Sequence, residues 1–312
     1  MRAAVSGCSA PGKLILFGEH AVVFGEPALA TAIDLRAEVF ARPHTEWLAD
    51  GRELSDPRYA YVNAAVERVG STKPLWIEIR SQVPEGSGLG SSAAVSVATL
   101  GALHRMRGTF DAARIAADAF EVETAVQGRA SPTDTTTATA GGAILVLPEE
   151  RDGLLWSFDR GDRHWFLHHR LLPPFDLVVG FTGVSASTGP LVAGVKRLVD
   201  SKPEARRWIS EIGEMTMEGV RALQAKDFVR GGELMDANHA LLNRLRVGHP
   251  LLDKLVAAAR PSSYGAKLTG AGGGGSMFAL TDEPEKTAKA IVGAGGRAFT
   301  VHAEPKGVVI LP

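Results

Sequence analysis

A glycine-rich segment just before residue 93 has the clearest chemical meaning in the sequence. It consists of Gly86, Ser87, Gly88, Leu89, Gly90, Ser91 and Ser92, and a largely apolar stretch follows it directly. Glycines let a backbone approach a ligand closely, and a helix that begins behind them directs free N–H groups at that ligand. The pattern predicts a phosphate site, at which the two hydroxyls can bind phosphate oxygen or a metal ion. The alternative is a turn whose serine caps a core helix. The segment is not a Walker A loop, because no Lys-Ser/Thr pair follows its glycines.

Three ionisable residues have unusual surroundings. Lys13 interrupts an apolar run, and because lysine is rarely buried unpaired, we expect it to meet a carboxylate or a ligand anion. Asp134 lies in a hydroxyl-rich segment, where it is either a reactive carboxylate or a simple turn former. Glu123 lies on an expected helix before that segment. It is either part of a site or an ordinary solvated helix residue.

A second glycine cluster, at 270–275, matches the dinucleotide fingerprint G-x-G-x-x-G literally. That fingerprint requires a helix to follow, whereas residues 276–280 have the pattern of a strand. A nicotinamide site is therefore disfavoured. The cluster is either a hairpin turn or a backbone surface that abuts a ligand, and the entropy lost on ordering so many glycines favours the second.

The composition narrows the function classes. The chain has 312 residues with a formal net charge of -1, which predicts two domains and gives no electrostatic basis for binding nucleic acid or a membrane. A single cysteine, Cys8, excludes an internal disulfide framework. His164, His168 and His169 have a spacing more typical of surface imidazoles than of a metal site. No targeting or membrane-spanning stretch is recognised, so we expect a cytoplasmic protein.

The elements that must position these residues alternate irregularly, which indicates an α+β fold. Strands are expected at 12–18, 28–39, 75–81, 142–147, 177–181 and 277–280, with a hairpin within 151–170. Helices are expected from the first glycine segment to Met106 and at 111–127, 189–200, 204–224, 226–245 and 250–260. The helix ending at Met106 is apolar nearly all round and should be buried, and 131–137 is expected to be a polar loop.

Three segments in this order resemble the three signature motifs of the GHMP kinases: 11–23 (PGKLILFGEHAVV), 84–94 (PEGSGLGSSAA) and 267–275 (KLTGAGGGG). The resemblance covers nearly the whole chain and is strongest to the mevalonate kinases of the archaeal type. It implies ATP-dependent phosphorylation of mevalonate and a two-domain α+β fold with the active site in the interdomain cleft. We place the N-terminal domain at 1–174 and the C-terminal domain at 175–312.

The resemblance also assigns roles residue by residue. It implies that Asp134 and Lys13 are catalytic and that Ser92 and Glu123 bind Mg²⁺. The first glycine segment, with Gly272 and Gly273, would hold the ATP phosphates. Glu19, His20, Thr188 and Asp134 would contact mevalonate, with His20 a candidate partner for its carboxylate. A homodimer is also implied. Two positions depart from the common pattern: Pro132 replaces a glycine, and Ser276 replaces a cysteine.

Two other interpretations are compatible with the same fold. A related kinase would phosphorylate phosphomevalonate, homoserine or a sugar. A non-catalytic nucleotide-binding relative should have lost Lys13, Asp134 or a metal ligand, and all of these are present. A purely structural protein would leave both glycine clusters unexplained.

Overall fold

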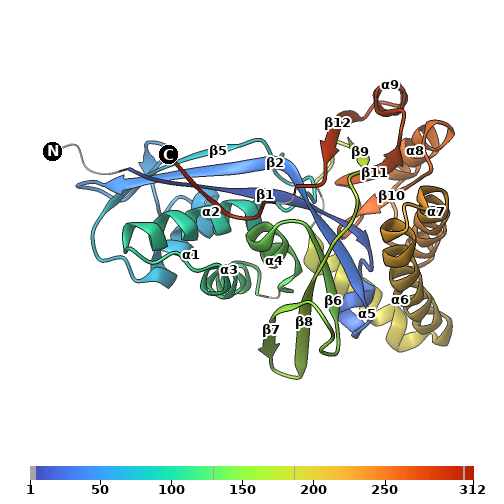
Figure 1. The fold of residues 1–312 in the computed structure, drawn as a ribbon, viewed down its shortest axis with the longest axis horizontal. Coiled ribbons are helices and arrows are strands. Elements are labelled where there is room, and N and C mark those ends of the chain that lie inside the picture. The colour runs from blue at the N-terminus through green and yellow to red at the C-terminus, as the bar shows by residue number, and fades with distance from the viewer. Residues whose placement is uncertain (1–4, 129, 186, 305) are drawn as a thin grey trace.

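The computed structural model describes residues 5–128, 130–185, 187–304 and 306–312. Within these ranges the strands form two sheets, and the helices pack against them (Figure 1). The first sheet comprises β1 (Ser6–Phe17), β2 (Ala28–Pro43), β3 (Leu48–Ala49), β4 (Arg52–Glu53), β5 (Leu75–Ser81), β6 (Ala143–Leu147), β7 (Leu154–Arg160), β8 (Arg163–Arg170) and β13 (Val309–Leu311). The second has the order β10-β11-β9-β12, formed by β9 (Asp176–Phe181), β10 (Gly265–Thr269), β11 (Ser276–Thr281) and β12 (Arg297–His302).

The long strand β2 organises the first sheet. One of its edges pairs with β1, and the other pairs with β6 near the start of β2 and with β5 near its end. Helix α2 (Ser91–Met106) lies against β1 and β2, while α1 (Ala60–Val69), α3 (Ala112–Gln127) and α4 (Thr133–Ala140) surround it (Figure 1). As the apolar sequence predicted, most of α2 is buried.

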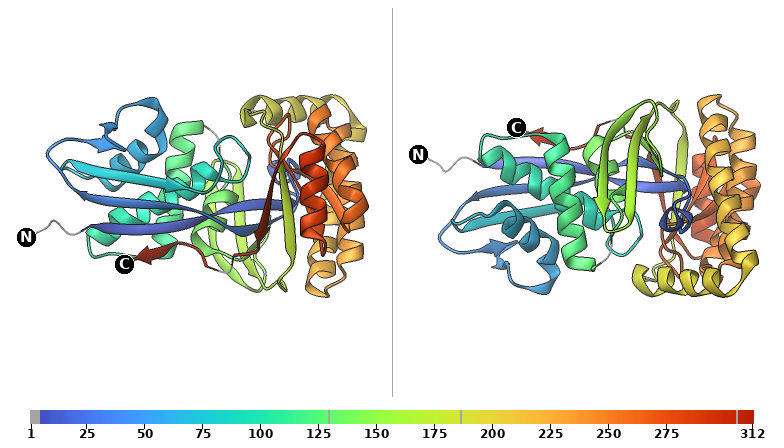
Figure 2. Two further views of the ribbon diagram at one scale, coloured as in Figure 1. Left: turned by 90° about the horizontal axis from the view of Figure 1, so that it is seen from above. Right: turned by 90° about the horizontal axis from the view of Figure 1, so that it is seen from below.

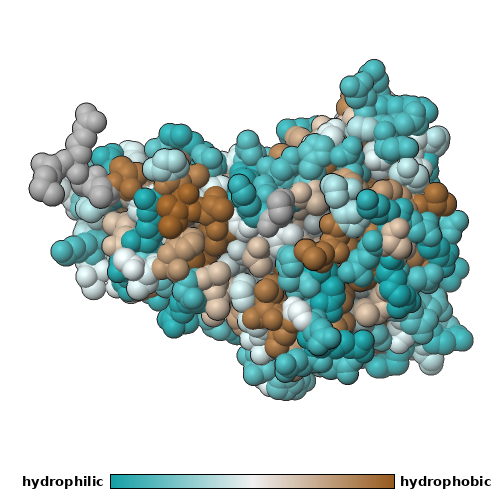
Figure 3. Space-filling view, viewed as in Figure 1, coloured by the Kyte–Doolittle hydropathy of each residue, from teal (hydrophilic) through white to brown (hydrophobic). Residues whose placement is uncertain are grey.

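The remaining helices accompany the second sheet and form the block on the right of both views in Figure 2. They are α5 (Thr188–Ser201), α6 (Pro203–Gln224), α7 (Phe228–Arg244), α8 (Pro250–Ala259) and α9 (Pro284–Gly293). Short 3-10 turns are η1 (Ala21–Phe24), η2 (Pro57–Tyr59) and η3 (Arg260–Ser262). In the described ranges, every helix is too short or too polar to cross a lipid bilayer. The face in Figure 3 shows hydrophobic patches separated by hydrophilic side chains.

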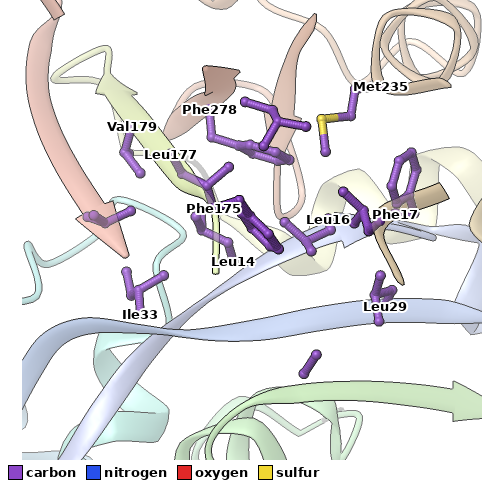
Figure 4. Close-up of a cluster of buried hydrophobic side chains, with 14 of the residues drawn as sticks. Leu14, Leu16, Phe17, Leu29, Ile33, Phe175, Leu177, Val179, Met235 and Phe278 are labelled. Carbon is purple, nitrogen blue, oxygen red and sulfur yellow. The ribbon is translucent and has the colours of Figure 1, made fainter. Parts of the chain in front are cut away.

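One hydrophobic cluster joins the two sheets, and β1 runs through it (Figure 4). Leu14 and Leu16 of β1 contribute to the same cluster as Leu177 and Phe278 of the second sheet. Because side chains alternate along a strand, Lys13 lies on the face opposite to these leucines. The core therefore fixes the strand from which Lys13 projects.

Most of the predicted elements are present, including the hairpin β7–β8, but two expectations were wrong. The first strand begins at Ser6 rather than at residue 12, because residues 6–11 also pair with β2. Small residues here let α2 approach closely: a Cβ on Gly101 would lie 3.2 Å from the Cys8 Cβ. The hydroxyl-rich segment is not a loop but continues into helix α4. There the Thr137 hydroxyl donates to the Thr133 carbonyl at 2.7 Å, which satisfies a buried polar group inside the helix.

The expected division between 1–174 and 175–312 stays a prediction. The second sheet begins with β9, directly after the proposed boundary, whereas the C-terminal strand β13 returns to the first sheet and pairs with β1. Several further strands and helices were not expected from the sequence: α1, α9, β3, β4, β10, β12 and β13.

Candidate active site

The first glycine segment wraps around Lys13. The Lys13 backbone N–H donates to the Leu89 carbonyl at 2.9 Å, and its ammonium donates to the Gly88 carbonyl at 3.2 Å. Gly90 has a φ of 75°, and a Cβ there would lie 2.8 Å from the Lys13 side chain, so only glycine fits. Helix α2 begins immediately behind the segment at Ser91. Its first N–H groups lack partners within the helix and can receive an anion.

The second glycine cluster lies beside the first. A Cβ on Gly275 would be 3.3 Å from the Ser87 carbonyl oxygen, and one on Gly270 would be 3.6 Å from that of Gly88. Gly273 N–H donates to the Val247 carbonyl at 2.8 Å. Strand β11 follows this cluster, as predicted, so the helix that a dinucleotide fingerprint requires is not there.

Lys13 and Asp134 form an ion pair, with 3.1 Å between the ammonium nitrogen and the carboxylate oxygen Oδ2. The lysine side chain is 3% exposed, whereas that of Asp134 is 27% exposed. Asp134 lies in the first turn of α4, and the buried threonines of that helix fix its backbone against the first sheet. The lysine thus meets the carboxylate that its burial required, and one face of that carboxylate remains open to a substrate.

Glu123 is a buried carboxylate on α3 beside this pair. Its Oε1 accepts a hydrogen bond from Gln127 Nε2 at 3.1 Å, while Oε2 is buried without a partner among the described atoms. Burial, and then the nearby charge of Asp134, raise the pKa of Glu123 to about 8. A cation bound at Oε2 would relieve both effects.

These residues fit a magnesium ion. Ser92 lies at the start of α2, and Tyr61, whose phenol accepts from Gln127, lies near both Ser92 and Glu123. The described residues contain no cluster of three or more His, Cys, Asp or Glu side chains suited to a metal. One carboxylate and one hydroxyl are nevertheless sufficient, because Mg²⁺ takes few protein ligands and fills its shell with phosphate oxygens and water.

Glu19 and His20 follow β1 at a turn that contacts strand β10. Glu19 forms an ion pair with Lys267, and both side chains are buried. His20 has a left-handed φ of 61°, and its Nε2 lies 2.9 Å from the Ala271 carbonyl oxygen. Since a carbonyl only accepts, Nε2 must donate. Burial lowers the pKa of His20, so the neutral ring has no second N–H, and Nδ1 is a buried acceptor without a partner.

Thr188 is less closely connected to these residues. It is exposed at the start of α5. Two residues shortly before it contact the glycine clusters. A Cβ on Gly86 would lie 2.3 Å from the Ser185 hydroxyl, and Gly275 N–H donates to the Val184 carbonyl. The structure therefore brings Lys13, Asp134, Glu123 and the two glycine clusters together, with Thr188 at their margin.

Sequence reasoning assigned no role to Lys267, which the structure places against Glu19. It carries the same signal as Lys13, a lysine inside an otherwise buried strand, and could have been singled out on that ground. Tyr61 and Gln127, which surround Glu123, gave no comparable signal in the sequence.

The chain matches two family models, "GHMP kinases N terminal domain" over residues 59–142 and "GHMP kinases C terminal" over residues 220–299. It is 35% identical to the mevalonate kinase of Thermococcus onnurineus, with 97% of each chain covered. Among solved structures, the Methanococcus jannaschii mevalonate kinase superposes with a TM-score of 0.80 at 26% identity, covering 97% of this chain and 99% of that one. The L. major mevalonate kinase in complex with R-mevalonate gives 0.81 at 26% identity, with 96% of each chain covered.

Proposed function

Because the chain belongs to the GHMP kinase family, and within it to the mevalonate kinases, we propose that it phosphorylates the primary C5 hydroxyl of mevalonate with ATP. The products are 5-phosphomevalonate and ADP, in the mevalonate pathway of isoprenoid biosynthesis. The observation that carries this proposal is the Lys13–Asp134 ion pair, 3.1 Å across, directly against the first glycine segment.

Phosphoryl transfer requires chiefly positioning and neutralisation of charge. The segment 86–92 and the first N–H groups of α2 would hold the phosphates, with Gly272 and Gly273 completing the wall. Asp134 would accept a hydrogen bond from the acceptor hydroxyl. It would then either remove the proton as a base or orient the hydroxyl for in-line attack. Lys13 would stabilise the negative charge that develops on the transferred group. Its contacts with Gly88 and Asp134 support this role, since it touches both the phosphate segment and the carboxylate.

Glu123 and Ser92 would hold the magnesium ion. When bound, the ion supplies positive charge to the phosphate oxygens. The unpartnered Oε2 of Glu123 supports this assignment.

The acceptor would lie near His20 and Thr188, with Asp134 at its reacting end. Because the single N–H of neutral His20 is donated to Ala271, we infer that its Nδ1 accepts from a hydroxyl of the acceptor rather than binding the carboxylate. Glu19, fully buried against Lys267, would then stabilise the turn that carries His20. A homodimeric state stays a prediction from the family resemblance, and a cytoplasmic location stays a prediction from the sequence.

A coupled assay of ADP release tests the proposal across four acceptors: mevalonate, phosphomevalonate, homoserine and galactose. We expect kcat/KM to be largest for mevalonate, and 5-phosphomevalonate should be identified as product by mass spectrometry. A preference for another acceptor would assign the chain to a different kinase. Absence of ADP release with every acceptor would favour a non-catalytic relative.

A further inference from the structure

Strand β10 and Ala271 beyond it contact the end of β1 and the turn that follows β1. Lys267 pairs with Glu19, the Thr269 hydroxyl accepts from Ile15 N–H at 3.1 Å, and the Ala271 carbonyl beyond the strand accepts from His20. Residues two apart project from the same face of a strand, so this edge of the second sheet forms one continuous seam with the end of β1.

The Lys267–Glu19 pair is the most deeply buried charge pair along this seam. The lysine side chain is 0% exposed and that of Glu19 is 1% exposed. Lys267 also donates to the Leu268 carbonyl at 2.8 Å, and its ammonium lies 5.3 Å from the centre of the Phe278 ring. A buried ion pair seldom stabilises a fold more than apolar residues of similar volume would. Its presence is therefore better explained by the geometry that it imposes.

That geometry concerns His20, the residue next to Glu19. A non-glycine residue with a φ of 61° is strained, and such a conformation persists only where its surroundings hold it. The Ala271 carbonyl holds the ring from one side, and the ion pair with Lys267 fixes the side chain of Glu19, the residue immediately before it, whose Oε2 is also buried without a partner. The outcome is a buried imidazole whose Nδ1 is unpartnered.

We propose that Lys267 is a positioning residue for the acceptor: through its ion pair with Glu19 it fixes the turn that directs Nδ1 of His20 at an acceptor hydroxyl. This inference rests on the proposed function, because it concerns the same site. The first glycine segment has Lys13, Ser185, Thr269, Gly270 and Gly275 as neighbours, and the contacts of Lys267 are with Glu19, Leu268 and Phe278 instead. Its effect should therefore fall on the acceptor and leave ATP binding unchanged.

The test compares Lys267→Met with the double variant Lys267→Met/Glu19→Gln. The single variant leaves Glu19 buried and unpaired, so it should lose stability. The double variant removes both charges and should regain most of that stability. If the pair positions His20, the double variant keeps a KM for mevalonate raised by at least about tenfold, while its KM for ATP stays within about twofold of the parent.

Asp118→Asn is the matched control, because it disrupts another buried carboxylate, outside the seam. It should lower stability and leave both KM values unchanged. A parental KM for mevalonate in the double variant would overturn the proposal, as would failure of the double variant to fold, which would assign the pair to the fold alone. If the parent prefers another acceptor, the proposed function fails, and the same KM comparison is made with that acceptor.

Discussion

Helix α3 carries two buried carboxylates five positions apart, and their surroundings are opposite. Asp118, 1% exposed, accepts from Arg68 Nε at 2.7 Å, from Arg114 Nε at 2.9 Å and from His104 Nε2 at 3.0 Å. Glu123, 5% exposed, receives one hydrogen bond from Gln127 and has an oxygen without a partner.

The pKa values of the two groups move in opposite directions. Burial alone would raise the pKa of Asp118, but hydrogen bonds from Arg68, Arg114 and His104 together hold it below its ordinary value. Burial and then Asp134 raise the pKa of Glu123 to about 8. The saturated carboxylate of Asp118 ties α1, α2 and α3 together, whereas the unsaturated carboxylate of Glu123 supports the proposed metal site. Burial by itself does not distinguish the two functions; the set of partners does.

The largest effect should come from Asp134, the open carboxylate next to Glu123. Asp134→Asn keeps the shape of the side chain but removes its charge, so it can neither take the acceptor proton nor pair with Lys13. We expect kcat to fall by at least ~10²-fold, with the protein still folded by circular dichroism. Near-parental turnover would remove Asp134 from the mechanism.

Glu123→Gln tests the unsaturated side of the comparison. Glu123 receives one hydrogen bond, from Gln127, so the substitution disturbs at most that bond. The free energy of unfolding should therefore stay equal or rise. Mg²⁺ binding in the presence of ATP, measured by calorimetry, should weaken by about 10- to 100-fold. Unchanged metal affinity together with a loss of stability would reverse the distinction between Glu123 and Asp118.

Asp118→Asn tests the saturated side. The variant loses charge-assisted hydrogen bonds, but Arg68 and Arg114 are 40% and 62% exposed, so water compensates in part. We expect the free energy of unfolding in urea to fall by about 2 kcal/mol, with kcat per folded molecule unchanged. A loss of turnover without a loss of stability would show that Asp118 belongs to the site as well.

The sequence predicted the chemistry of this region better than its architecture. Lys13 was recognisable because a lysine inside an apolar strand requires a partner. The glycines of 86–92 were recognisable because glycines directly before a helix favour a phosphate site over a simple turn. The helix at Thr133–Ala140 was missed because threonine has a poor helix propensity, which here is overcome by burial and by hydroxyl-to-carbonyl bonds. The partners of Asp118 were not predictable. They come from three helices, and no local pattern encodes which arginine reaches which acid.

The smallest expected effect concerns a buried base, His168, in place of the buried acids compared above. His168, fully buried in β8, accepts from Arg151 N–H at Nε2, 2.9 Å away, and lies 3.3 Å from the Leu145 carbonyl through Nδ1. Burial lowers its pKa, so the unfolded chain binds a proton near pH 6.5 that the folded protein resists.

The contribution of His168 to stability should therefore fall as the pH drops below about 6.5, by up to about 1.4 kcal/mol per pH unit for this one proton. His168→Gln retains an acceptor for Arg151 and a donor for Leu145 but does not titrate. Urea unfolding at pH 7, 6 and 5 should show a shallower decline for the variant. The residual slope combines His20 and His239, whose pKa values burial also lowers, with Glu123, whose raised pKa acts in the opposite direction. Parallel curves for the two proteins would mean that His168 is protonated without cost, and that its contact with Arg151 does not select the neutral ring.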